Sequence, residues 1–201
     1  GRDYFDPAMF NLIEIYKGGG SALYGSDAMG GVIAMRTLDA SDILGGKEWG
    51  AFSRSQYFSV NDMLAQQLGG AWGKGDFRMM LLYSGRRGGE TENQGGSLYK
   101  PNPVNFDSHS ALGKFDYSAG SQRFQLTLES FRRDVDVNTR SAVRESSMGG
   151  FNNYVLNYQL MERQRASLRW EFEPASDWVD KMEAQAYWQS SENRSDNLSG
   201  S

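Results

Sequence analysis

The chain has 201 residues, 24 glycines, 4 prolines, no cysteine and a formal net charge of −4. The lack of cysteine excludes a disulfide scaffold, a thiolate metal site and a cysteine nucleophile. The weakly acidic balance, without a basic block, argues against nucleic acid as a partner, because phosphate neutralisation requires clustered lysine and arginine.

The first predicted elements are two short strands on either side of a glycine-rich segment. Residues 12–16 and 32–37 have the apolar composition of strands, and residues 17–31 between them are rich in glycine. Glycine in such numbers indicates tight turns or positive φ. The segment is not a phosphate loop, because Ser26 stands where that loop requires lysine. It also lacks the glycine spacing of a dinucleotide-binding fingerprint.

From Trp49 onward, apolar and polar residues alternate with a period of two, which is the pattern of strands with two different faces. In residues 181–188, methionine, alanine and tryptophan alternate with lysine, glutamate, glutamine and tyrosine. We predict about seven strands in an antiparallel meander, with the polar face turned toward residues 1–40. The predicted strand segments are 49–60, 64–72, 77–84, 110–117, 124–129, 165–172 and 181–188.

The connections between these segments are alternately short and long. Residues 73–76, 118–122 and 173–177 form short connections, and residues 85–107 and 134–153 form long ones. Only the connection near Asn61 and Asp62 is shorter than this scheme requires. Short turns at one rim and long loops at the other are typical of outer-membrane barrels.

The apolar faces contain alanine, glycine, methionine and large aromatic residues, whereas a soluble sandwich would use mainly valine, isoleucine and leucine. Aromatic residues gather toward the strand ends, as in the interfacial girdles of membrane barrels. The predicted girdle residues are Trp49, Trp72, Tyr83, Tyr117, Phe131, Trp170, Phe172, Trp178 and Trp188. The pattern favours a membrane barrel, and a soluble β-rich binding module is the alternative.

A longer motif covers the glycine-rich segment and the strands beside it. Its positions are Ile13, Glu14, Ile15, Lys17, Gly18, Gly19, Ser21, Leu23, Tyr24, Gly25, Ser26, Gly30, Gly31, Val32 and Ile33. This motif closely resembles the end of the plug domain of TonB-dependent outer-membrane receptors, although Gly19 stands where that family usually has proline. Residues 37–44 and the lead-in at residues 4–7 resemble haem and haemoglobin receptors, a group that grades into transferrin and lactoferrin receptors.

The resemblance implies an all-β fold, with an α+β plug end beside an antiparallel, up-and-down transmembrane β-barrel. Residues 1–45 are expected to be the C-terminal part of the plug domain, and residues 46–201 the N-terminal part of the barrel. Receptors of this family have 22 strands, so about seven form a partial, unclosed barrel. We therefore expect the chain to be about a third of a receptor, with the TonB box outside it.

The same resemblance implies a receptor in the outer membrane that takes up haem, or iron from haem proteins. Its implied partners are the TonB–ExbB–ExbD energising complex, the cargo and outer-membrane lipid. Haem is expected as transported cargo and not as a covalently bound cofactor, and no catalytic or metal-ligating residue is expected because the family does no covalent chemistry. The alternatives are another cargo (an iron–siderophore, transferrin or cobalamin) or an outer-membrane enzyme barrel that uses His109 with Ser108 or Ser110.

Two groups of residues are candidates for particular roles. Cargo contacts near the extracellular side are predicted in the long connection and at the strand that follows it: Arg86, Arg87, Tyr99, Lys100 and His109. The plug signature has a predicted structural role. Within and beside that signature, Glu14, Lys17 and Arg36 are expected to hold the plug against charged residues of the barrel wall.

Overall fold

A computed structural model describes residues 6–17, 31–91, 102–138, 154–174, 178 and 180–200. In chain order, the elements of this part are η1 (Pro7–Met9), β1 (Phe10–Lys17), β2 (Gly31–Thr37), α2 (Ala40–Leu44), β3 (Trp49–Phe58), β4 (Met63–Lys74), β5 (Phe77–Gly88), β6 (Val104–Ala119), β7 (Gln122–Asn138), β8 (Tyr154–Phe172) and β9 (Met182–Gly200). Among the described residues, no helix combines the length and the apolar character needed to cross a membrane.

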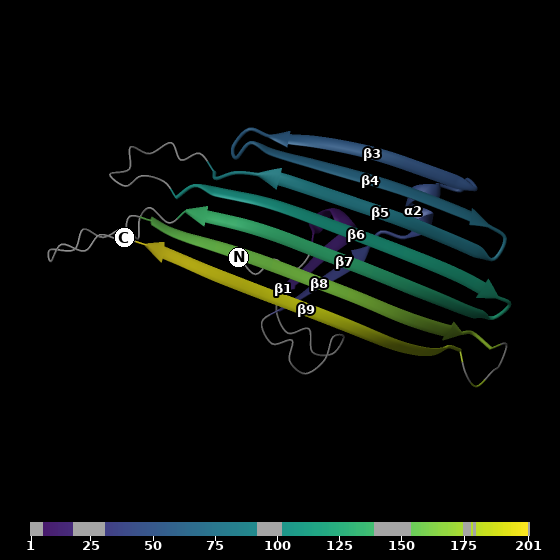
Figure 1. Ribbon diagram of the computed structural model, residues 1–201. Helices are drawn as coiled ribbons and strands as arrows, with labels where there is room; N and C mark the ends of the chain where they lie inside the picture. The colour runs from purple at the N-terminus through teal and green to yellow at the C-terminus, as the bar shows by residue number, and fades with distance from the viewer. Residues whose placement is uncertain are drawn as a thin grey trace.

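Strands β3 to β9 form one antiparallel sheet, and each strand pairs with its neighbours in sequence. Figure 1 shows a tilted, curved sheet that is open, with β3 and β9 as its two edges. The turns at residues 75–76 and 120–121 lie at one end of the sheet, which we call the short-turn end. The opposite end is the long-loop end. The predicted seven-stranded, unclosed meander is confirmed.

Several strands are longer than the alternating apolar pattern predicts. Strands β6 to β9 have 16, 17, 19 and 19 residues. Backbone pairing continues past the apolar segment toward the long-loop end, where Val104 still pairs with Val137. The extension carries charged side chains on both faces, so hydrophobic alternation alone does not reveal it. Residues 92–101 and 139–153, which hold most of the two predicted long loops, lie outside the described residues.

The two faces of the sheet differ in polarity. The inner face looks toward η1, β1, β2 and α2 and carries most of the Arg and Gln side chains of the strands. The outer face carries most of the exposed large apolar side chains of the sheet. These are Trp49, Tyr57, Leu64, Leu68, Trp72, Leu81, Tyr83, Tyr117, Phe124, Leu126, Leu128, Tyr158, Leu168, Met182 and Trp188. The predicted orientation, with the polar face toward the N-terminal residues, is therefore confirmed.

Aromatic side chains of the outer face form a row near the short-turn end. Trp49 pairs with Trp72 across β3 and β4. Further along the same end, Tyr117 pairs with Phe77 on one side and with Phe124 on the other. A row of this kind is what an interfacial girdle requires, because each ring can lie at the same depth in a membrane.

Phe131 is not part of such a row, and its assignment to the girdle is wrong. It points to the inner face, where only 5% of the residue is exposed. It is in register with Ser110 and Arg163, which also face inward. The reason is the period of two: the alternation that points Phe124 outward points the odd-numbered positions of β7 inward.

The N-terminal part of the chain lies against the inner face of the sheet (Figure 1). We call residues 6–17 and 31–44 the end segment. Its strands β1 and β2 pair antiparallel, with Ile15 opposite Ile33. Helix α2 begins with a capping box, and Gly45 caps its C-terminus with a left-handed φ of 54°. This glycine lets the chain turn directly from the helix toward β3.

A small apolar core joins the end segment to the inner face. Its buried members are Met9, Ala40 and Leu44 from the end segment and Ala71, Met80, Leu82 and Leu112 from the sheet. Gly50 allows the close approach of β3 to α2, because a Cβ atom built there would lie 2.5 Å from the backbone oxygen of Ile43. Burial of these side chains holds α2 on the inner face of the sheet β3–β9, which we call the wall, by the hydrophobic effect.

This close approach predicts the effect of Gly50→Ala. We expect the substitution to push α2 away from β3 and to cost about 1–3 kcal/mol of stability through overpacking. The control is Gly70→Ala on the outer face, where the nearest atom would be 4.0 Å from the new Cβ. Thermal unfolding of the full-length protein in detergent micelles measures both. Equal midpoints for the two variants would contradict the packing argument.

Candidate functional site

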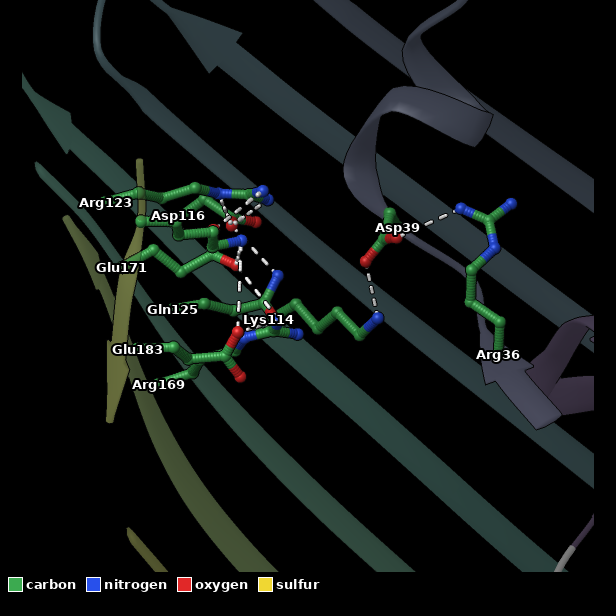
Figure 2. A network of polar contacts seen from close by, with 10 residues as sticks. Arg36, Asp39, Lys114, Asp116, Arg123, Gln125, Arg169, Glu171 and Glu183 are labelled. Carbon is green, nitrogen blue, oxygen red and sulfur yellow. Dashed lines mark hydrogen bonds and ion pairs between the residues drawn. The ribbon is translucent and has the colours of Figure 1, made fainter. Parts of the chain in front are cut away.

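The candidate site is the interface between the end segment and the inner face of the sheet. One buried polar contact comes from Lys114 in β6, whose side chain is only 6% exposed. Lys114 Nζ donates to Asp39 Oδ1 at 2.5 Å and lies 3.4 Å from the Thr37 carbonyl oxygen. Figure 2 shows this lysine extending from the sheet to the residue that precedes α2. The contact ties the start of α2 to the wall.

Two further contacts hold the beginning of the end segment. Gln67 Nε2 donates to the Ala8 carbonyl oxygen at 2.6 Å. Arg86 donates through Nη2 to Asp6 Oδ1, which also accepts from the Ala8 backbone N–H at 2.9 Å. The Asp6 side chain is 1% exposed. A buried carboxylate requires a charged or hydrogen-bonding partner, so Arg86 stabilises this segment in its position on the wall.

A ladder of charges covers the inner face of β6 to β9 near the short-turn end (Figure 2). Asp116 accepts from Arg123 at 2.7 Å and from Gln125 at 2.9 Å. Arg169 lies 3.0 Å from Glu171 and 2.7 Å from Glu183. Each charge has a partner of opposite sign, which lowers the cost of placing charged side chains on the inner face.

The predicted cargo contacts do not form one group. Arg86 and Arg87 were expected in a long loop, but both lie in β5, because pairing with β4 and β6 continues to the end of that strand. Arg86 faces inward and contacts Asp6, whereas Arg87, the next residue, faces outward. Tyr99 and Lys100 lie outside the described residues.

His109 lies on the outer face, in β6. Its Nδ1 atom is 2.6 Å from Tyr83 Oη, and its Nε2 atom is 2.6 Å from Asp107 Oδ1. Ser108 and Ser110 are buried on the inner face. Because adjacent strand residues point to opposite faces, neither serine is in reach of this imidazole, and the geometry gives no support to the hydrolytic alternative.

The plug-signature residues are only partly described. Glu14 and Lys17 lie in β1 and are exposed, and Gly31 begins β2. Gly18, Ser21, Leu23, Tyr24, Gly25, Ser26 and Gly30 lie outside the described residues. Arg36 was expected to meet the wall, but it contacts Asp39 at 3.4 Å and Asp42 at 3.6 Å within its own segment.

Sequence reasoning missed the residues that attach the end segment to the wall. Lys114 and Asp39 are far apart in the chain, and no motif links them. The available signal was weak: Lys114 is a lysine in the middle of a predicted strand, on the face turned toward residues 1–40. The described residues hold no group of three or more His, Asp or Glu side chains placed to bind a metal ion.

Comparisons with known proteins find relatives of this chain. Residues 1–32 match the family TonB-dependent Receptor Plug Domain. Lactoferrin-binding protein A of Neisseria meningitidis serogroup B is 38% identical over 86 residues, which cover 42% of this chain and 9% of that protein. Transferrin-binding protein A of the same serogroup is 40% identical over 79 residues, which cover 39% of this chain and 9% of that protein. The Hemin receptor of Yersinia pestis is 26% identical over 190 residues, which cover 92% of this chain and 27% of that protein.

A solved structure supports the fold. The FrpB iron transporter from Neisseria meningitidis (F3-3 variant) has a TM-score of 0.73 at 22% identity, covering 94% of this chain and 30% of that chain. The chain therefore spans from less than a tenth to less than a third of the proteins it matches. Their names are those of binding proteins, a receptor and a transporter, in agreement with the prediction that the chain is not an enzyme.

The Lys114–Asp39 contact predicts a stability effect. We expect Lys114→Met to destabilise the protein by about 1–3 kcal/mol, because it leaves a partly buried carboxylate with a weaker set of partners. The control is Lys74→Met. The Lys74 ammonium lies 3.9 Å from Glu48 Oε1, and 69% of the lysine side chain is exposed. That change should cost less than about 1 kcal/mol. Both changes are measured from the unfolding midpoints of the full-length protein. An unchanged midpoint for Lys114→Met would refute a stabilising role of the Lys114–Asp39 contact.

Proposed function

We propose that the chain forms the plug end and first barrel strands of an outer-membrane, TonB-dependent receptor for iron-related cargo. Residues 1–45 are then plug and residues 46–201 are barrel wall. One observation carries the proposal: the sheet has an apolar outer face and a charged inner face, and the end segment lies on the charged one. The plug-domain match and the names of the relatives support it.

The outer face supports a membrane setting. Its apolar band runs from the aromatic row at the short-turn end to a charged region near the long-loop end. There, Arg132 on the outer face contacts Asp134 at 2.9 Å and Glu162 at 3.0 Å. A bilayer core needs about 9–11 residues of a tilted strand, so strands of 16–19 residues extend beyond it, and their charged ends reach water.

For the cargo we propose haem, taken up as free haem or from haem proteins, with energy from TonB and its ExbB–ExbD partners. Support comes from residues 37–44, which resemble haem receptors, and from the Hemin receptor, whose similarity extends over 92% of this chain. Iron from transferrin or lactoferrin is the second candidate, because the relatives with those names have higher identity over a shorter stretch.

The membrane setting predicts a clear difference between two arginine substitutions on the outer face. Leu81 lies in the apolar band, and we expect Leu81→Arg to cost about 2–4 kcal/mol and to lower the amount of folded protein in the outer membrane. Gln66 is also on the outer face but is in register with Gly85, near the charged region. Gln66→Arg should be tolerated. Heat-modifiable gel migration of membrane fractions measures the amount of folded protein for each variant. Equal amounts would contradict the proposal that the apolar band faces lipid.

The cargo proposal predicts which ligands the full-length protein binds. We expect haemin and haemoglobin to bind to cells that display the protein, and growth on haemin as the iron source to require TonB. Cells without TonB are the control, since they should bind haemin and fail to import it. Binding of transferrin or lactoferrin in place of haemin would favour the second candidate. Failure to bind any of these four would refute iron-related cargo of this kind.

A further inference from the structure

A hollow of about 420 Å³ lies on the inner face toward the long-loop end, beside the first residues of the end segment. Arg86, Arg133, Phe106 and Phe131 line it from the sheet, and Asp6 and Pro7 line it from the end segment. In the row of paired residues that crosses these strands, Ser108 stands between Arg86 and Arg133. Two guanidinium groups from inward positions two strands apart therefore border one cavity.

The lining has the chemistry to bind an anion attached to a flat ring. The guanidinium carbon of Arg133 lies 5.2 Å from the centre of the Phe106 ring. Arginine binds carboxylates through paired N–H groups and stacks on flat π-systems, and phenylalanine offers a surface for another ring. The ionisable residues that line the hollow are two arginines and one aspartate.

The hollow already contains one bound carboxylate, that of Asp6. Its Oδ1 atom accepts from Arg86, and its Oδ2 atom has no hydrogen-bond partner among the described residues. The Asp6–Arg86 contact thus shows that the Arg86 guanidinium can bind a carboxylate at this position. It also shows that this internal carboxylate is incompletely satisfied, which makes its replacement by a better-paired anion less costly.

A second hollow begins at the same contact. It has a volume of about 580 Å³ and extends from Pro7 and Arg86 toward Ile43 in α2. Because Pro7 and Arg86 line both hollows, the Asp6–Arg86 contact lies at their boundary. Release of Asp6 from Arg86 would loosen the segment that separates the two spaces and would weaken one of the polar contacts between the end segment and the wall.

We propose that the hollow near the long-loop end is a subsite for a flat, conjugated group that carries a carboxylate, and that this carboxylate replaces Asp6 on Arg86. Occupancy of the subsite is thereby coupled to loss of one of the contacts that hold residues 6–9 on the wall. The idea rests on the proposed function only in that cargo reaches the inner face from the long-loop end. The subsite itself follows from Arg86, Arg133 and Asp6.

The probe is pyrene-1-carboxylate, and 1-pyrenemethanol is its neutral counterpart. Fluorescence titration of the full-length protein in detergent micelles should show at least about tenfold tighter binding of the carboxylate, the size expected for a charged hydrogen bond. Arg86→Met and Arg133→Met should each remove this preference. Arg87→Met is the matched control, because the neighbouring side chain faces outward, and it should retain the preference.

Asp6→Asn tests the exchange itself. If the internal carboxylate competes for Arg86, its neutralisation should tighten binding of pyrene-1-carboxylate several-fold and leave 1-pyrenemethanol unchanged. A merely structural role of Asp6 would weaken both probes or neither. Should Arg86→Met fail to fold, Arg133→Met and Asp6→Asn still decide the question.

The proposal is overturned if wild-type protein shows no preference for the carboxylate, if Arg86→Met and Arg133→Met match Arg87→Met, or if Asp6→Asn does not tighten binding. None of these outcomes depends on whether the protein binds haem. A protein that binds pyrene-1-carboxylate as described but not haemin would keep the subsite and lose the proposed cargo. The reverse result, haemin binding that is insensitive to Arg86, Arg133 and Asp6, would keep the cargo and lose the subsite.

Discussion

The structure depends on backbone pairing across one continuous sheet whose two faces meet different surroundings. Successive side chains of a strand point to opposite faces, so a single register fixes which residues lie outside and which lie inside. Leu81 and Arg86 belong to the same strand, yet the first lies in the apolar outer band and the second contacts a buried aspartate. The same pairing satisfies the backbone hydrogen bonds of β4 to β8 on both sides, whereas β3 and β9, at the edges of the sheet, each pair with one neighbour.

Attachment of the end segment to the wall combines apolar packing with a few polar contacts of high local importance. The buried core around Met80 and Leu44 provides most of the non-directional attraction. The Lys114–Asp39 contact fixes where α2 begins, and a glycine at position 50 lets β3 approach that helix closely. Since an uncompensated buried charge is costly, the polar contacts determine position more than they add stability.

The inner face is divided into regions with different roles. Near the short-turn end, alternating charges between Asp116 and Glu183 satisfy one another within the wall. Near the long-loop end, the hollow beside Asp6 has two arginines and one aspartate. The difference matters for function, because a self-compensated ladder has little to offer an incoming anion, whereas guanidinium groups beside aromatic rings can bind one. A receptor that moves its plug would use the second region, where the exchange that we propose releases Asp6 of the end segment from Arg86.

The sequence by itself determined the strand period, the number and order of the strands, the apolar outer face and the motif of the end segment, because each depends on residues close together in the chain. Strand ends were predicted less well: Arg86 and Arg87 lie in β5 rather than in a loop, since pairing with neighbouring strands extends beyond the apolar pattern. Only the tertiary structure decided which polar residues meet, as in Lys114 with Asp39 and Arg86 with Asp6. Those contacts join positions some 75 and 80 residues apart, so the position of the end segment on the sheet, and not any local pattern, brings them together.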